Sequence, residues 1–153
     1  MISRLRRVFD LGADSDAINQ VLGADPVLAP LIDLKPGLRS PGAWDVFEMA
    51  VRAVLGQQIT VAGAATLGGR LCERLGVKVD FGDGLARAFP TPEAMVGADL
   101  TDLGLPRKRA ETLNRLATAF IDAPALLSPQ QSLEKAVDEL SLIHISEPTR
   151  QDR

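Results

Sequence analysis

Apolar residues recur at helical spacing through most of this 153-residue chain, which predicts an all-α fold built as a helical bundle. Helix starts such as Thr91-Pro92-Glu93 and helix stops such as Gly76 separate the periodic segments. The stretch 77–89 alternates only weakly and is interrupted by Gly82-Asp83-Gly84, so we expect a loop with at most a short strand there. A length of 153 residues is enough for one domain with a real core, and the hydrophobic share of 46% is ordinary for a globular protein.

The first third of the chain predicts three short helices. The first covers 2–11, and the second begins at a cap supplied by Asp14 or Ser15 and closes at Gly23. Asp25-Pro26 opens the third, which covers 27–34 and ends before Pro36. Proline and glycine therefore divide this part into short elements.

Two longer helices are expected on either side of the stretch 56–60. The first has an apolar face formed by Trp44, Phe47, Val51, Val54 and Leu55. The second has one formed by Val61, Ala64, Ala65, Gly68, Leu71, Cys72 and Leu75. Glu48 and Arg52 form an i,i+4 pair outside the first helix, and Thr60 caps the second. Because the second helix is rich in small residues, we expect it to be central and tightly packed.

After the helix that starts at Thr91-Pro92-Glu93, two more helices complete the pattern. One follows the turn at 103–106 and runs to Pro124, with Glu111 and Arg115 bracing its outer side. The other starts at a capping box over 128–131. Its apolar face consists of Leu133, Ala136, Val137 and Leu140.

Composition excludes several classes of protein. The net charge of −3 argues against binding to nucleic acid by bulk charge, although a local basic face stays possible. Aromatic residues are 4% of the chain, too few for a platform that stacks single-stranded bases. The single cysteine rules out an internal disulfide and fits a reducing, cytoplasmic location. We expect no membrane span, because no apolar run approaches about 18 residues.

Few side chains offer catalytic or metal chemistry. One Cys and one His cannot supply a metal site, so we expect none, and His144 lies in an irregular tail. Turn chemistry explains Asp99 and Asp102 better than acid–base catalysis does. The basic cluster Arg107-Lys108-Arg109 has two interpretations, a phosphate contact or a solvated first helical turn, although cations are unfavourable at a helix N-terminus.

Gln57 and Gln58 lie where one apolar helix ends and the next begins. Each side chain has two donors and an acceptor, which a tight turn between helices does not by itself require. They could cap helices and bond buried backbone, or they could reach outward to a ligand. The pattern alone leaves both open and favours the first.

Several stretches resemble the DNA-3-methyladenine glycosylase II family, which belongs to the helix-hairpin-helix superfamily of base-excision repair glycosylases. They lie at 36–42, 47–62, 89–93 and 103–113, in order and with natural spacing. The most specific is Arg52-Ala53-Val54-Leu55-Gly56-Gln57-Gln58-Ile59-Thr60. The resemblance runs from about Ser3 to Leu140 and implies a partial helix-hairpin-helix glycosylase fold.

The resemblance also implies an activity and a partner. Such enzymes hydrolyse the N-glycosidic bond of alkylated bases of the 3-methyladenine type, without a cofactor, after flipping the base out of double-stranded DNA. Gln58 would then be the wedge that enters the minor groove and fills the gap, and Gln57 would support the loop or touch the same bases. A cytoplasmic, nucleoid-associated bacterial protein is implied.

Two departures from the family bear on activity. An upstream α+β domain is expected to be absent, and no Leu-Pro-Gly-Ile-Gly-type hairpin or catalytic aspartate follows Leu140. Instead, 141–153 resembles translated sequencing-adapter readthrough, so we expect a partial glycosylase domain over 1–140 and a disordered or artefactual tail. No catalytic residue is assigned, and we expect a chain that does not excise bases.

Two other interpretations stay open. The chain could be a non-catalytic helical module that binds DNA or a protein partner. It could also be a marginal fragment, monomeric but prone to aggregation because apolar surface is exposed.

Overall fold

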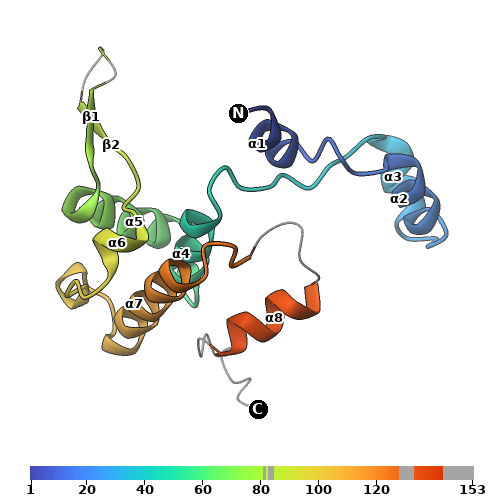
Figure 1. Cartoon of the computed structure of the whole chain (residues 1–153). Helices are drawn as coiled ribbons and strands as arrows, with labels where there is room; N and C mark the ends of the chain where they lie inside the picture. The colour runs from blue at the N-terminus through green and yellow to red at the C-terminus, as the bar shows by residue number, and fades with distance from the viewer. Residues whose placement is uncertain (81, 83–84, 128–132, 143–153) are drawn as a thin grey trace. The chain divides into compact units, whose positions relative to one another are not determined.

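The computed structural model describes residues 1–80, 82, 85–127 and 133–142. The chain divides into two compact units, 1–45 and 46–153, which are described separately (Figure 1). Helices dominate both, and the sheet that the described residues contain has two short strands, so the all-α fold class is confirmed. The domain boundary expected at residue 140 stays a prediction, because 143–153 lies outside the described residues.

Unit 1 contains α1 (Ile2–Val8), α2 (Ser15–Leu22) and α3 (Ala29–Leu34). The Asp14 carboxylate caps α2 by accepting hydrogen bonds from two backbone N–H groups. Of the two predicted caps, Asp14 and Ser15, the structure therefore shows Asp14. The Arg7 guanidinium donates to the carbonyls of Ala43 and Trp44 and so ties the end of the unit to α1. Within the fully described range 1–45, no helix has a buried residue.

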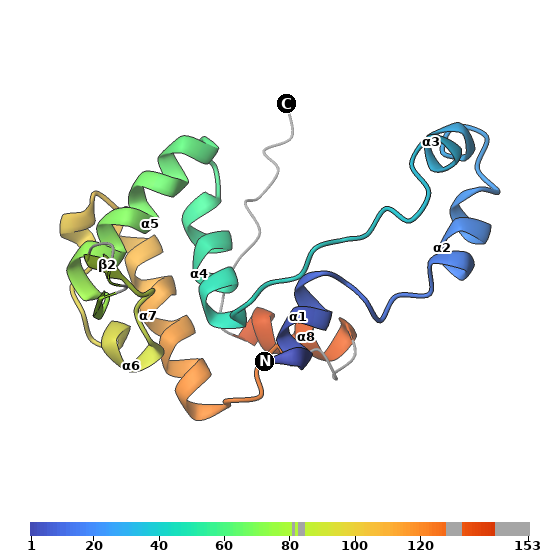
Figure 2. The ribbon, with the colours of Figure 1, turned by 90° about the horizontal axis from the view of Figure 1, so that it is seen from above.

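The hydrophobic core belongs to unit 2. There α7 (Arg107–Asp122) packs against α4 (Val46–Gly56) and α6 (Pro92–Met95) (Figure 2). The rings of Phe47 and Phe120 meet edge to face, with centroids 5.1 Å apart. The largest fully buried side chains are Val51, Leu55, Leu71, Pro90, Met95, Leu100, Leu113 and Leu116. This core positions the C-terminus of α4 and the N-terminus of α7, which form the candidate site.

Helix α5 (Val61–Leu75) is less buried than its sequence predicts. It packs along one side against α4 and the 3₁₀ helix η1 (Thr101–Leu103), and of its residues only Gly68 and Leu71 are buried. Val61 is 88% exposed, although its spacing placed it on the apolar face. The expectation of a central helix is therefore wrong, because helical spacing identifies an apolar face without showing that another element covers it.

A β-hairpin replaces the loop expected after α5. Strands β1 (Lys78–Asp80) and β2 (Leu85–Arg87) pair antiparallel, with Val79 opposite Ala86. The Arg87 guanidinium donates to the carbonyl of Gly76 at 3.0 Å and joins the hairpin to the end of α5. The second strand forms because it pairs with the first, and the weak alternation of apolar residues in the sequence gives little indication of that pairing.

Two ion-pair expectations have opposite outcomes. The pair between Glu48 and Arg52 is confirmed, with 2.7 Å between oxygen and nitrogen. Glu111, however, pairs with Arg107 at 3.0 Å, and Arg115 donates to the Thr112 hydroxyl instead.

The last described element is α8 (Leu133–Leu142). Val137, expected on its apolar face, is 55% exposed, and the expected capping box at 128–131 lies outside the described residues. Among the helices that the structure describes, none is long and apolar enough to cross a membrane.

Candidate nucleic-acid interface

The turn between α4 and α5 exposes Gln58 in an unusual backbone conformation. Its φ of 60° lies in the left-handed region, where a Cβ atom is disfavoured by about 1–2 kcal/mol. The Gln58 side chain is exposed, whereas Gln57 is half-buried. Non-glycine residues in this region cluster at functional sites, which makes Gln58 the most distinctive residue of the turn.

Both ends of this turn are fixed by the neighbouring helices. On the α4 side, the Gln57 amide donates to the carbonyl of Val54. On the α5 side, the Thr60 hydroxyl accepts a hydrogen bond from the amide of Gly63 at 3.1 Å, which confirms the predicted cap. Gln58 is therefore presented from a short turn between two helices rather than from a long loop.

Arg109 joins the first turn of α7 to this loop. Its Nη2 donates to the carbonyl oxygen of Gln57 at 2.7 Å, across 52 positions of sequence. This is the contact that sequence reasoning missed. The signal that could have suggested it is a cation at a helix N-terminus, where the helix dipole disfavours it.

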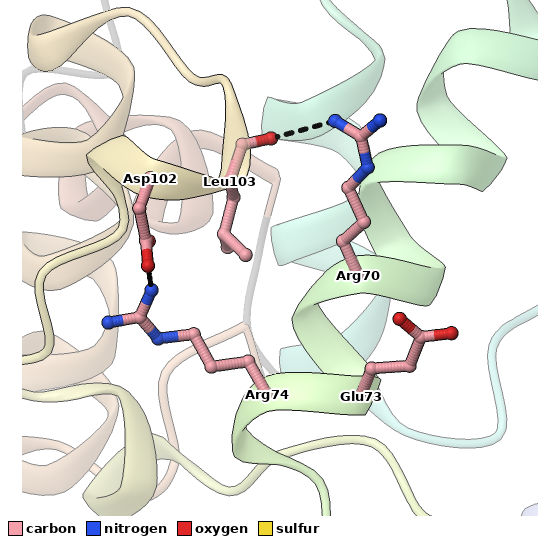
Figure 3. Close-up of a pocket in the computed structure, with 5 residues that line it drawn as sticks. All are labelled: Arg70, Glu73, Arg74, Asp102 and Leu103. Atoms are coloured by element: carbon pink, nitrogen blue, oxygen red, sulfur yellow. Dashed lines mark hydrogen bonds and ion pairs between the residues drawn. The ribbon is translucent and has the colours of Figure 1, made fainter.

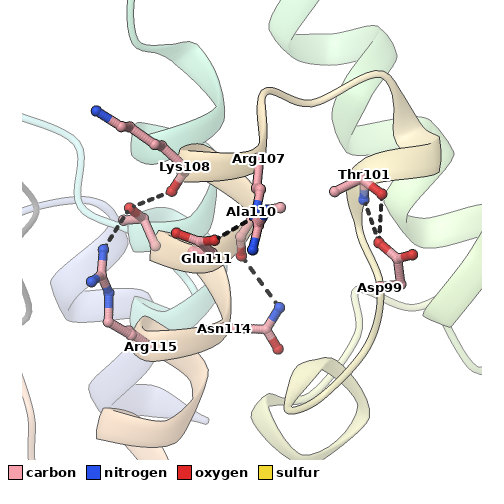
Figure 4. Close-up of polar contacts among 9 residues, drawn as sticks. Asp99, Thr101, Arg107, Lys108, Ala110, Glu111, Asn114 and Arg115 are labelled. Carbon is pink, nitrogen blue, oxygen red and sulfur yellow. Dashed lines mark hydrogen bonds and ion pairs between the residues drawn. The ribbon is translucent and has the colours of Figure 1, made fainter.

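The three basic residues at this end of α7 have different surroundings, and Figure 4 shows two of them, Arg107 and Lys108. Arg107 pairs with Glu111 and is largely exposed, and Lys108 is exposed. Arg109 is half-buried at the Gln57 carbonyl. Of the two interpretations of this cluster, a solvated first turn describes Arg107 and Lys108, and neither describes Arg109.

The carboxylates Asp99 and Asp102 stabilise local structure, as turn chemistry predicts. Asp99 accepts hydrogen bonds from the hydroxyl and amide of Thr101, at 2.6 and 3.0 Å, and these bonds hold its pKa below the usual value. Asp102 forms an ion pair with Arg74. Neither carboxylate is poised for proton transfer.

An open hollow of about 470 Å³ lies between α5 and η1 (Figure 3). Arg70, Glu73, Arg74, Asp102 and Leu103 line it. Arg70 donates to the carbonyl of Leu103 at 3.2 Å, and Arg74 pairs with Asp102. These contacts join α5 to the 3₁₀ helix.

The described residues hold no group of three or more His, Cys, Asp or Glu side chains that could bind a metal ion. His144 lies outside them. Burial raises the pKa of the Cys72 thiol, and the Arg52 charge opposes that rise only in part, so Cys72 stays a thiol at neutral pH.

Known proteins resemble this chain over nine-tenths of its length. DNA-3-methyladenine glycosylase 2 of Escherichia coli is 37% identical over 143 residues, which are 91% of this chain and 48% of that protein. A Mycobacterium tuberculosis protein named "Probable bifunctional transcriptional activator/DNA repair enzyme AlkA" is 37% identical over 139 residues, 90% of this chain and 28% of its own length.

The chain is a relative of the DNA-3-methyladenine glycosylase II family. It spans less than half the length of these two proteins. The model of the AlkA N-terminal domain matches residues 1–45, the same residues as unit 1. The expectation that the upstream domain is absent is therefore wrong for the part that this match covers.

Solved structures confirm the glycosylase fold. The 3-methyladenine DNA-glycosylase from Archaeoglobus fulgidus has a TM-score of 0.61 and 27% identity, over 75% of this chain and 41% of that one. The apo form of Clostridium acetobutylicum 8-oxoguanine glycosylase/lyase has a TM-score of 0.74 and 20% identity, over 91% and 50%. At this lower identity the second likeness bears on the fold alone.

Proposed function

We propose that this chain provides a DNA-contacting part of a base-excision repair glycosylase, in which Gln58 enters the minor groove of damaged duplex DNA. The exposed Gln58 side chain, in its left-handed conformation at the tip of the α4–α5 turn, is the observation that carries the proposal. A side chain at such a tip can fill the space that a flipped base leaves and bond the unpaired base opposite it.

The proposed role divides between the two glutamines. Gln58 has both amide donors and a carbonyl acceptor to offer to the edge of an orphaned base, which an apolar wedge lacks. Gln57 supports the loop through its backbone carbonyl, which accepts the hydrogen bond from Arg109. The proposed substrate class is double-stranded DNA with alkylated bases, and the proposed reaction of the family is N-glycosidic hydrolysis.

No residue of this chain is assigned to the chemical step. By resemblance the family's catalytic aspartate follows a hairpin, and neither Asp99 nor Asp102 matches that position. The chain's own contribution is therefore binding and gap filling at the damaged position. The same contacts in a bacterial cytoplasm would place it on the nucleoid.

Duplex binding tests this proposal. The 153-residue chain should bind a duplex with an abasic site more tightly than an intact duplex, because the gap there needs no base flipping. Gln58→Ala should weaken that preference by about tenfold, through the loss of hydrogen bonds to the orphaned base. Fluorescence anisotropy at several salt concentrations gives the affinities.

Gln20→Ala, the same substitution at an exposed position of α2, is the matched control and should leave the preference unchanged. Equal affinity of the unaltered chain for both duplexes would contradict the proposed gap filling. Release of 3-methyladenine from alkylated DNA by this chain would show that it carries chemistry as well.

A further inference from the structure

We propose that Arg109 is a positioning residue, which holds the peptide plane between Gln57 and Gln58 so that the Gln58 side chain is presented to DNA. The inference rests on the function proposed for Gln58 and adds the device that orients it. It concerns a contact between two segments 52 positions apart, at the N-terminus of α7 and the C-terminus of α4.

The hydrogen bond from Arg109 to the Gln57 carbonyl restrains the rotation described by the φ of Gln58. The Gln57 carbonyl and the Gln58 amide belong to one planar peptide unit. Fixing the carbonyl oxygen at 2.7 Å from the Arg109 guanidinium therefore fixes the plane about which the φ of Gln58 is defined. That φ is 60°, a value that an unrestrained glutamine disfavours, so an external contact is needed to hold it.

Charge favours the same arrangement. The last carbonyl groups of α4 carry the negative end of its helix dipole, and a cation beside them is stabilising. Arg109 lies at the carbonyl that follows the last residue of α4, Gly56. This contact offsets the unfavourable position of the Arg109 cation at the N-terminus of α7. Arg107 lies at the same N-terminus, and its charge is offset by the ion pair with Glu111.

Backbone geometry in the free protein provides the first test. The three-bond coupling between the amide and α protons of Gln58, measured by NMR, depends on φ, and the nuclear Overhauser effect between the same two protons distinguishes a positive φ from a negative one. Arg109→Ala should shift this coupling away from its value in the unaltered chain. Arg107→Ala removes a positive charge from the same helical turn without touching the loop, and should leave the coupling unchanged. An unchanged coupling in Arg109→Ala overturns the proposal.

A double-mutant cycle in DNA binding provides the second test. If Arg109 acts through Gln58, Arg109→Ala should weaken binding to an abasic duplex about tenfold, and the double variant with Gln58→Ala should lose no more than Gln58→Ala alone. If Arg109 instead contacts a phosphate, the two losses should multiply, and the salt dependence should fall by about one phosphate contact relative to the unaltered chain. That second pattern overturns the proposal.

The two tests separate this inference from the function on which it rests. If the unaltered chain has no preference for the abasic duplex, the proposed function fails, and the NMR coupling still decides whether Arg109 sets the backbone of Gln58. If the preference is present and the coupling is unchanged in Arg109→Ala, the function stands and the positioning role fails.

Discussion

Gln58 has a backbone conformation that the local sequence does not favour. Its φ of 60° requires support from outside the turn, and the half-buried Arg109 contact to Gln57 supplies it. Strain held in this way orients one exposed side chain, because the helices on either side fix both ends of the turn. At this scale, structure and proposed function depend on the same two residues.

Replacing Gln58 should show the backbone strain as a difference in the free energy of unfolding between two variants. Gln58→Gly removes the Cβ atom that the left-handed conformation disfavours, whereas Gln58→Ala retains it. We expect the glycine variant to have a free energy of unfolding about 1 kcal/mol higher than the alanine variant, measured by urea denaturation. A glycine variant less stable than the alanine variant would mean that the turn does not keep a positive φ in solution.

At the scale of the element, local chemistry could be predicted and tertiary pairing could not. The caps at Asp14, Thr60 and Thr91 follow from side chains within three residues of the groups that they satisfy. The contact of Arg109 with Gln57 joins segments that no local pattern links. The predictions for α5 and for the second strand of the hairpin were wrong for the same reason. The exposure of α5 and the formation of that strand both depend on which element packs beside them.

The cap of α5 should contribute measurably to stability. Thr60→Ala leaves the amide of Gly63 without its side-chain acceptor, so we expect a loss of about 1 kcal/mol in the free energy of unfolding. Thr118→Ala makes the same substitution at an exposed position within α7, where alanine is the better helix former. Chemical denaturation of both variants should therefore show destabilisation for the first and none for the second.

The whole molecule has its buried apolar side chains in unit 2. The buried hydrophobic residues run from Phe47 to Leu126, while within 1–45 several large apolar side chains are exposed, among them Phe9, Val21, Leu31 and Leu34. Exposed apolar surface of this extent favours association, as the expectation of a marginal, aggregation-prone fragment states. Cooperative stability should come from unit 2 alone.

Two identical substitutions, one in each unit, test that distribution. Leu116→Ala opens a cavity at a fully buried site between α7 and its neighbours, so we expect the free energy of unfolding to fall by about 2–5 kcal/mol. Leu31→Ala truncates a side chain that is 59% exposed, so its effect should stay within about 0.5 kcal/mol. Thermal unfolding followed by circular dichroism gives both values. Equal losses would mean that Leu31 is covered in solution, and the apolar side chains of unit 1 would then belong to a packed interface.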